Sequence, residues 1–272
     1  MTREEIVEEL NRRGYKAEPD EIFKNGVKVE GIKMLTETHI NPFFRIDEVL
    51  KNAEKQQLTT DIVVEALLIN FEMSQKLQID PKSFLNRQNI LDNIYIGLQE
   101  ISEEELEKRP TDFTGLEKYL YVCEKRPDSG YNVVKVQKQL LQHVEISEDE
   151  AWQRAEENTN SETVIASIDE FVGIQTLLEQ CGTTTVPFYI ITNGLGIRGA
   201  ASILNRKALK DLAQRLDINE FLAIPSSIHE MLLIPYPIDV DIDVVSEFVR
   251  TVNASVVDPL ERLTDRAYII HV

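Results

Sequence analysis

The amino-acid sequence predicts an α+β protein, with a mixed β-sheet covered by helices and a smaller N-terminal helix–hairpin–helix lobe. Apolar residues recur at helical spacing in several segments, and short apolar runs typical of strands lie between them. Asn25-Gly26, which stands between two such runs, is a strong signal for a hairpin. With 272 residues, 42% of them hydrophobic, the chain can bury a sizeable core without disulfides or metals.

Residues 1–80 are expected to form the N-terminal lobe. Its predicted elements are a helix over Thr2–Arg13, a tight hairpin at Asn25-Gly26, and helices over Asn41–Lys55 and Thr60–Met73. The last helix should be capped by Thr60. It should bury one apolar face, made of Ile62, Val63, Ala66, Leu67 and Ile69.

The polar stretch Ser74–Asn93, which contains Pro81, favours a boundary before a main lobe at 81–272; the alternative is one continuous domain. Strands of the main lobe are predicted at Ile94–Leu98, Lys118–Cys123, Tyr131–Val136, Pro187–Thr192, Phe221–Ile224, Ile228–Ile234 and Ala267–His271. Helices are predicted through Trp152–Glu157 and over Glu162–Glu179, Arg206–Leu216 and Val244–Ala254.

Two acidic segments share one pattern, in which a serine precedes a glutamate by three residues. They are Ser102 with Glu105 and Ser147 with Glu150. In a capping box the serine oxygen accepts a free backbone N–H, and the glutamate reaches back to the serine amide. Both segments are therefore predicted to begin helices rather than to form a metal or catalytic site.

The charge balance limits the classes of partner. Asp and Glu number 47 against 29 Lys and Arg, which gives a net charge of −18. Such a surface repels phosphate backbones and anionic lipid but attracts a basic protein partner, so we expect neither nucleic-acid nor membrane binding. No apolar run is long enough to span a membrane. The charged start Met1–Glu5 lacks an apolar signal core, and a cytoplasmic location is expected.

No metal or cofactor is expected from the ligand-type residues. Cys123 and Cys181 fit no metal or redox spacing and are predicted to be free thiols, and the four histidines are widely spaced. Asp239–Asp243 resembles the start of a calcium loop. However, Val244 and Arg250 stand where an EF-hand needs glycine and glutamate.

Asn193–Gly199 contains the spacing G-x-G-x-x-G after a predicted strand. In a dinucleotide fold these glycines let the backbone approach a pyrophosphate. The motif comes late in the chain, and Ser226 and Ser227 stand where an acidic residue should end the next strand. A turn with close helix–strand packing at Gly199–Ala201 is the favoured interpretation.

Pro225–Glu230 places two hydroxyls, an imidazole and a carboxylate within a short segment. Ser227, His229 and Glu230 are the candidate catalytic residues, with Asn193 and Ser226 as candidate binding residues. Neighbouring side chains on a strand point to opposite faces, which favours a structural role. We then expect either serine to bond backbone near Asn193 or the terminal strand, and His229 or Glu230 to pair with another side chain.

Several of these segments together resemble an uncharacterised bacterial domain-of-unknown-function family. The resemblance rests mainly on Phe188–Asn193, Gly199–Leu204 and Ile224–Glu230, and extends to Phe23–Val27, Gly31-Ile32, Ile94–Leu98 and Ala155–Thr159. It implies one related fold over essentially the whole chain, and it implies no activity.

Two functions remain open at this point, and the sequence leaves open whether the protein is an enzyme. The first is a non-enzymatic interaction or regulatory protein whose acidic surface engages a basic protein partner. The second is a hydrolase-like enzyme that uses the Ser226, Ser227, His229 and Glu230 cluster. We favour the first, because no motif combines a nucleophile, a base and an oxyanion site.

Overall fold

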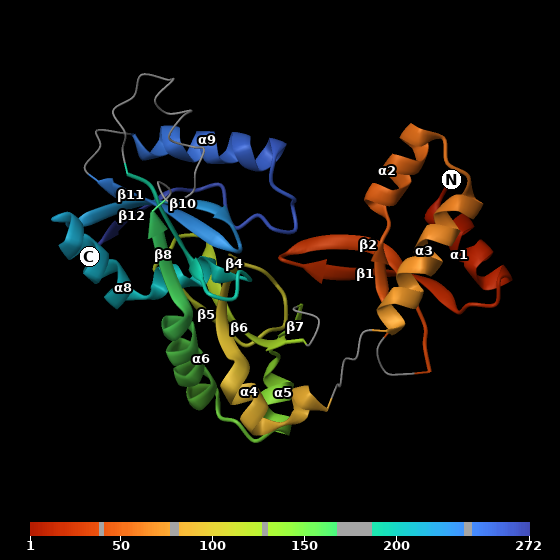
Figure 1. Cartoon of the computed structure of the whole chain (residues 1–272), viewed down its shortest axis with the longest axis horizontal. Helices are drawn as coiled ribbons and strands as arrows, with labels where there is room; N and C mark the ends of the chain where they lie inside the picture. The colour runs from red at the N-terminus through yellow and green to blue at the C-terminus, as the bar shows by residue number, and fades with distance from the viewer. Residues whose placement is uncertain (38–40, 77–81, 127–129, 168–186, 237–240) are drawn as a thin grey trace. The chain divides into compact units, whose positions relative to one another are not determined.

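The computed structural model describes residues 1–37, 41–76, 82–126, 130–167, 187–236 and 241–272. These residues fold into two compact units, Met1–Asp80 and Pro81–Val272, each with helices and β-sheet (Figure 1). The predicted α+β class is therefore confirmed. Every strand pairing in the described residues is antiparallel, so the second unit contains two antiparallel sheets instead of the mixed sheet expected.

The described part of the first unit begins with a helix and a hairpin. Its elements are α1 (Arg3–Arg12), β1 (Ala17–Lys24), β2 (Val27–Met34), β3 (Phe43–Arg45), α2 (Asp47–Gln56) and α3 (Thr60–Gln75). Lys24 lies opposite Val27 across the turn, and Asn25 and Gly26 have φ angles of 53° and 73°. Two positive φ angles are those of a type I′ turn, so the tight two-residue hairpin is confirmed.

The helix predicted over Asn41–Lys55 begins only at Asp47. Phe43–Arg45 instead forms β3, which pairs with β2 and places Gly31 opposite Arg45. Gly31 makes this pairing possible, because a Cβ atom there would collide with the backbone carbonyl oxygen of Phe44 as well as with the Phe43 ring. The start of the predicted helix was wrong because a pairing with a distant strand overrode the local periodicity.

The buried face of α3 also differs from the prediction. The helix is capped by Thr59 rather than Thr60, since the Thr59 hydroxyl accepts the N–H of Ile62 at 3.4 Å. Its buried residues are Val63, Val64, Leu67 and Leu68. Ile62, Ala66 and Ile69 are exposed. The helix is apolar on nearly every side, so packing against α1 selects the buried face and periodicity does not.

The second unit is the larger one. Its described elements are η1 (Ser83–Leu85), α4 (Arg87–Asn93), β4 (Ile94–Glu100), β5 (Lys108–Pro110), β6 (Leu116–Lys125), β7 (Tyr131–Lys135), α5 (Lys138–His143), α6 (Glu148–Glu162), β8 (Thr163–Ser167), β9 (Tyr189–Asn193), η3 (Gly199–Leu204), α8 (Arg206–Leu216), β10 (Glu220–Ser227), β11 (Glu230–Tyr236), α9 (Ile242–Ser255) and β12 (Tyr268–His271). All seven predicted strands are present, with shifted ends, and the predicted helix Arg206–Leu216 is α8.

The two sheets of this unit are linked by a short 3₁₀ helix. One sheet has the order β4-β6-β5 with β7 also paired to β6, and the other has the order β12-β10-β11-β9-β8. The 3₁₀ helix η3 contacts β9 and β11 of the second sheet and β4 of the first. Helices α4 and α6 pack on the first sheet, and α9 lies against β10 (Figure 1).

Only one of the two predicted capping boxes begins a helix. Ser147 caps α6, and its hydroxyl accepts the N–H of Glu150 at 3.2 Å. Residues 101–107 contain no helix. The Ser102 hydroxyl instead donates to Glu117 at 3.0 Å and accepts from Gln99 at 2.9 Å. The prediction for Ser102 was wrong because these two strand residues satisfy its side chain.

The prediction of a helix over Glu162–Glu179 was wrong for its first residues. Thr163–Ser167 forms β8, in which Ile165 lies opposite Ile191 of β9. Threonine, valine and isoleucine fit a pleated sheet better than a helix. Residues 168–179 lie outside the described residues.

Candidate functional site

The polar cluster predicted from the sequence lies at the turn of the β10–β11 hairpin. Ser226 and Ser227 end β10, Ile228 and His229 form the turn, and Glu230 begins β11. The Ser226 hydroxyl donates to Oε1 of Glu230 at 3.2 Å, which confirms the expected side-chain pairing. The Ser227 hydroxyl accepts the N–H of His229 at 3.0 Å. Both serines therefore bond within their own hairpin, and the contacts expected near Asn193 or the terminal strand were wrong.

His229 is held by three other segments. Its Nδ1 accepts the backbone N–H of Arg198 at 3.1 Å, and its carbonyl oxygen accepts the Thr192 hydroxyl at 2.8 Å. Its Nε2 lies 3.7 Å from Oε1 of Glu261. Burial lowers the pKa of His229, and this effect outweighs the opposing attraction of Glu261. The imidazole is therefore neutral at pH 7, with its proton on Nε2 because Nδ1 is an acceptor.

These contacts do not assemble a nucleophile and base. A general base must receive the hydroxyl proton on a free nitrogen lone pair. The Nδ1 lone pair of His229 already accepts from Arg198, and the Ser227 oxygen accepts from the backbone. The Ser226 hydroxyl donates its proton to Glu230. In this arrangement the cluster stabilises a turn between two strands.

Asn193 organises the glycine-containing segment that follows β9. Its side chain donates from Nδ2 to the carbonyl oxygen of Ile197 at 2.8 Å, and its Oδ1 accepts the N–H of Ile197 at 3.3 Å. A dinucleotide site would need unpaired backbone N–H groups here. Five of them are already bonded, those of Gly194, Gly196, Ile197, Arg198 and Ala200.

Gly199 explains why glycine is needed at the end of this segment. A Cβ atom there would lie 2.6 Å from the carbonyl oxygen of His229 and 2.7 Å from the amide nitrogen of Asn193. The backbone of η3 therefore approaches the end of β9 and the β10–β11 turn too closely for a side chain. This geometry confirms the close packing expected at Gly199–Ala201, although these residues begin a 3₁₀ helix rather than an α-helix.

A buried polar network that the sequence interpretation missed covers one face of β4 and β6. Gln99 donates to Glu117 at 2.9 Å, and Lys108 lies 3.1 Å from the same carboxylate oxygen. Lys135 lies 2.5 Å from Glu104 and donates to Gln99 at 3.0 Å. Buried charges are tolerated when they are paired in this way. The alternation of Glu117, Tyr119, Tyr121 and Cys123 was the available signal, because alternate strand residues share a face.

Hydrogen bonding and burial shift the pKa values of residues on this face. Burial acts to raise the pKa of Glu117, but hydrogen bonds from Gln99, Lys108 and Ser102 outweigh it and lower that pKa. Burial raises the pKa of the Cys123 thiol to about 11, so this free cysteine is not a reactive thiolate at neutral pH. The guanidinium of Arg198 donates to the Tyr119 hydroxyl, which joins this network to the loop beside His229.

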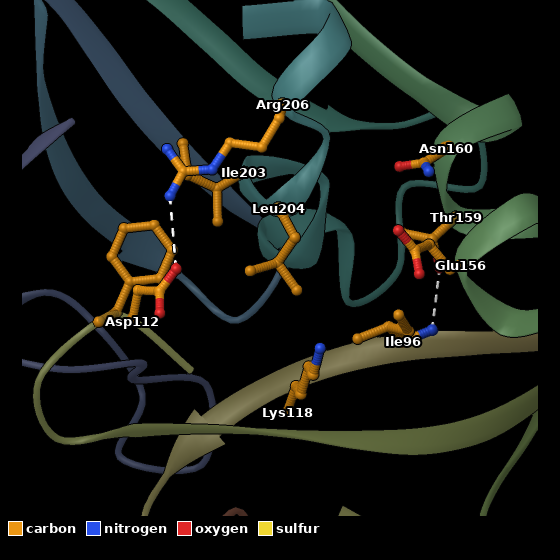
Figure 2. A pocket seen from close by; sticks show the side chains of 10 residues that line it. Ile96, Asp112, Lys118, Glu156, Thr159, Asn160, Ile203, Leu204 and Arg206 are labelled. Atoms are coloured by element: carbon orange, nitrogen blue, oxygen red, sulfur yellow. Dashed lines mark hydrogen bonds and ion pairs between the residues drawn. The ribbon is translucent and has the colours of Figure 1, made fainter. Parts of the chain in front are cut away.

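A cavity of about 210 Å³ lies between the first sheet, α6 and η3 (Figure 2). Its lining residues are Ile96, Asp112, Phe113, Lys118, Glu156, Thr159, Asn160, Ile203, Leu204 and Arg206. None of the site residues predicted from the sequence is among them. The Thr159 hydroxyl accepts the N–H of Ile96 at 2.9 Å and so joins α6 to β4 at the cavity wall.

Charged side chains at the cavity come from four separate elements of the chain. Arg206 lies 3.5 Å from Asp112 at the rim, where the Asp112 side chain is almost fully exposed. Lys118 points into the cavity from β6 and Glu156 from α6 (Figure 2). The cavity therefore contains both signs of charge against an apolar wall, a composition suited to binding a small polar molecule.

The described residues were also searched for metal-binding clusters and for membrane-spanning helices. In that part of the chain, no group of three or more His, Cys, Asp and Glu side chains is placed to hold a metal ion. None of the helices found there has the length and apolar character needed to cross a bilayer.

Residues 2–271 match the model of a family of unknown function, DUF5688, and the chain belongs to that family. The resemblance to an uncharacterised family is thereby confirmed over nearly the whole sequence. No curated protein and no solved structure matches the chain.

Proposed function

We propose that this protein is a non-enzymatic interaction or regulatory protein, and that it binds a basic protein partner through the exposed side of α3. The observation that carries the proposal is a row of apolar residues, which we name the α3 stripe: Ile62, Ala66, Ile69 and Met73. Their spacing of four, three and four residues places them in one line along the helix.

The α3 stripe is open to solvent. The side chains of Ile62, Ile69 and Met73 are 51%, 58% and 61% exposed. The opposite side of the same helix is buried in the core of the first unit, through Val64 and Leu67 among others. A helix that is apolar on both sides but buried on one is expected to cover its second face with a partner.

Acidic residues border the stripe on one side and indicate the charge of the partner. Asp61, Glu65 and Glu72 lie along this edge, and α3 contains no Lys or Arg. Arg13 lies 2.6 Å from Asp61 and 2.5 Å from Glu65. The same guanidinium also contacts Glu9, so one positive charge is shared among three carboxylates and the edge stays negative.

An amphipathic helix with Lys or Arg beside its apolar row matches this surface. Its apolar side chains would cover the α3 stripe, and its cations would lie along the acidic edge. A second copy of this chain fits less well, because two acidic edges would face each other. We place this interaction in the cytoplasm, where a free buried thiol such as Cys123 is ordinary.

The hydrolase-like alternative has weaker support. It would need a free imidazole nitrogen near Ser226 or Ser227. However, Nδ1 of His229 already accepts a hydrogen bond from the backbone N–H of Arg198. The hydrogen bonds of Ser226, Ser227 and Glu230 favour a role in the turn.

Binding of two matched peptides tests the proposed function. Both are helices of about 18 residues with leucines at the spacing of the α3 stripe; one has lysines beside the leucines and the other has glutamates. Fluorescence anisotropy should detect binding of the lysine peptide to the full chain and none of the glutamate peptide. Equal binding of the two peptides would show that the acidic edge does not select a basic partner.

Variants locate the surface. Ile69→Ser and Glu72→Lys should each weaken binding of the lysine peptide by about tenfold or more, because they remove an apolar contact and a carboxylate. Phe248→Ser is the matched control for the first, since Phe248 is 66% exposed on α9. Asp211→Lys, at an exposed position of α8, is the control for the second. Unchanged binding by both α3 variants would overturn the proposal.

A further inference from the structure

The cavity of Figure 2 holds two opposite charges that do not neutralise each other. Lys118 enters from β6 and Glu156 from α6 (Figure 2). Within the described residues, neither side chain forms an ion pair or a hydrogen bond. An ammonium and a carboxylate that share a cavity without meeting leave space for a ligand that contacts both.

The size of the cavity limits the ligand. A volume of about 210 Å³ is far more than one ordered water requires. It is below the roughly 300 Å³ at which pockets for drug-sized ligands begin. The space therefore suits a small metabolite and excludes a dinucleotide or a folded peptide segment.

We propose that this cavity binds a small zwitterion of the α-amino acid class. The carboxylate of the ligand would lie against the Lys118 ammonium, and its ammonium group against the Glu156 carboxylate. Its side chain would lie against the apolar wall formed by Ile96, Phe113 and Leu204. This site belongs to the second unit and is independent of the α3 stripe.

The charge arrangement distinguishes a zwitterion from simpler ions. A carboxylic acid without an amine would meet the repulsion of Glu156, and an amine without a carboxylate would meet that of Lys118. The ion pair at the cavity rim does not alter this balance, since Arg206 and Asp112 already lie 3.5 Å apart. A ligand with both charges is attracted by the Lys118 ammonium and by the Glu156 carboxylate at the same time.

The single tryptophan of the chain reports on Lys118. Its ammonium lies 5.4 Å from the centre of the Trp152 ring, within the range of a cation–π contact. A carboxylate that draws the ammonium toward the cavity would change the environment of this ring. Ligand binding is therefore expected to change the tryptophan fluorescence of the wild-type chain.

Titration of the full chain with the standard free amino acids tests the proposal. Isothermal titration calorimetry should give a Kd of about 1 mM or tighter for at least one of them, with a parallel change in Trp152 fluorescence. The carboxylic acid and the amine that share the side chain of the tightest amino acid should each bind at least about tenfold more weakly.

Two substitutions separate the charges. Lys118→Met and Glu156→Gln should each weaken binding of the amino acid by about tenfold, whereas Lys210→Met on α8 should leave it unchanged. Glu156→Gln should at the same time strengthen binding of the carboxylic acid, and Lys118→Met that of the amine. A simple anion site would lose the carboxylic acid on Lys118→Met but would not weaken on Glu156→Gln.

Three results would overturn the proposal. The first is that no amino acid binds the wild-type chain at concentrations of about 10 mM. The second is that the carboxylic acid or the amine binds as tightly as the amino acid. The third is an unchanged affinity in both Lys118→Met and Glu156→Gln, with melting curves showing that the variants are folded.

Discussion

The backbone N–H of Arg198 donates a hydrogen bond to Nδ1 of His229 across 3.1 Å. Arg198 adopts a left-handed conformation with φ of 53° immediately before η3. The guanidinium of the same residue donates to the Tyr119 hydroxyl of the other sheet. One arginine thus connects the two sheets of the second unit through its backbone and its side chain.

His229 should make the stability of the protein depend on pH. Its pKa is lowered in the folded state, so the unfolded chain binds the proton more readily. The contribution of the neutral imidazole is complete above about pH 6.5, the ordinary histidine pKa. It decreases as the pH falls below that value toward the folded pKa. Urea unfolding of the wild type at pH 7.5 and 5.5 should show this loss of stability.

His229→Asn is the matched variant, because the Asn oxygen can accept the Arg198 N–H but cannot titrate. The stability advantage of the wild type over this variant should shrink between pH 7.5 and 5.5. An equal difference in unfolding free energy at the two pH values would show that His229 does not titrate in this range.

Gly199→Ala should be strongly destabilising. The added Cβ would lie 2.6 Å from a backbone oxygen of His229, and backbone atoms cannot move aside cheaply. We expect a loss of about 3 kcal/mol in unfolding free energy. Gly196→Ala is the comparison, since its φ is +68° but nothing lies within 4 Å of its Cβ position. It should cost about 1 kcal/mol, and a larger cost than at position 199 would contradict the close-packing argument.

The two serines of the capping-box pattern should differ in their contribution to stability. Ser147→Ala removes one N-cap contact and should cost about 1 kcal/mol. Ser102→Ala removes a hydroxyl that donates to the buried Glu117 and accepts from Gln99, and should cost about 2 kcal/mol. Chemical denaturation of both variants measures this order. A smaller cost at Ser102 would show that Glu117 finds replacement donors.

Salt should slow association at the α3 stripe. The Debye length falls from about 30 Å at 0.01 M ionic strength to about 8 Å at 0.15 M, which screens the acidic edge. The association rate of the lysine peptide should fall by about tenfold over this range in stopped-flow measurements. The Ile69→Ser variant should keep this salt dependence and dissociate faster. A salt-insensitive association rate would contradict the electrostatic part of the proposed function.

Local sequence was sufficient wherever the signal comes from neighbouring residues. Asn25-Gly26 predicted its turn because both residues accept positive φ, whatever surrounds them. The helix Arg206–Leu216 was predicted with correct ends, because its apolar stripe is a local feature. Seven strands of the second unit were found for the same reason, although their ends moved by a few residues, whereas β5 and β8 were not predicted as strands.

Tertiary contacts decided the features that depend on distant residues. Ser102 and Ser147 share a local pattern, but only Ser102 lies beside Glu117. The Ser102 hydroxyl bonds to this carboxylate and does not cap a helix. Packing against α1 chose which side of the apolar helix α3 is buried and so left the α3 stripe exposed.

The sequence by itself determined the α+β class, the acidic charge and most of the elements, because propensity and periodicity act over a few residues. It did not determine where side chains from separate elements meet. Lys118 and Glu156 reach one cavity only after β6 and α6 have packed, and no spacing along the chain encodes that meeting (Figure 2). The polar cluster at Ser226–Glu230 was visible in the sequence because it is local, and the structure shows that its hydrogen bonds close a turn.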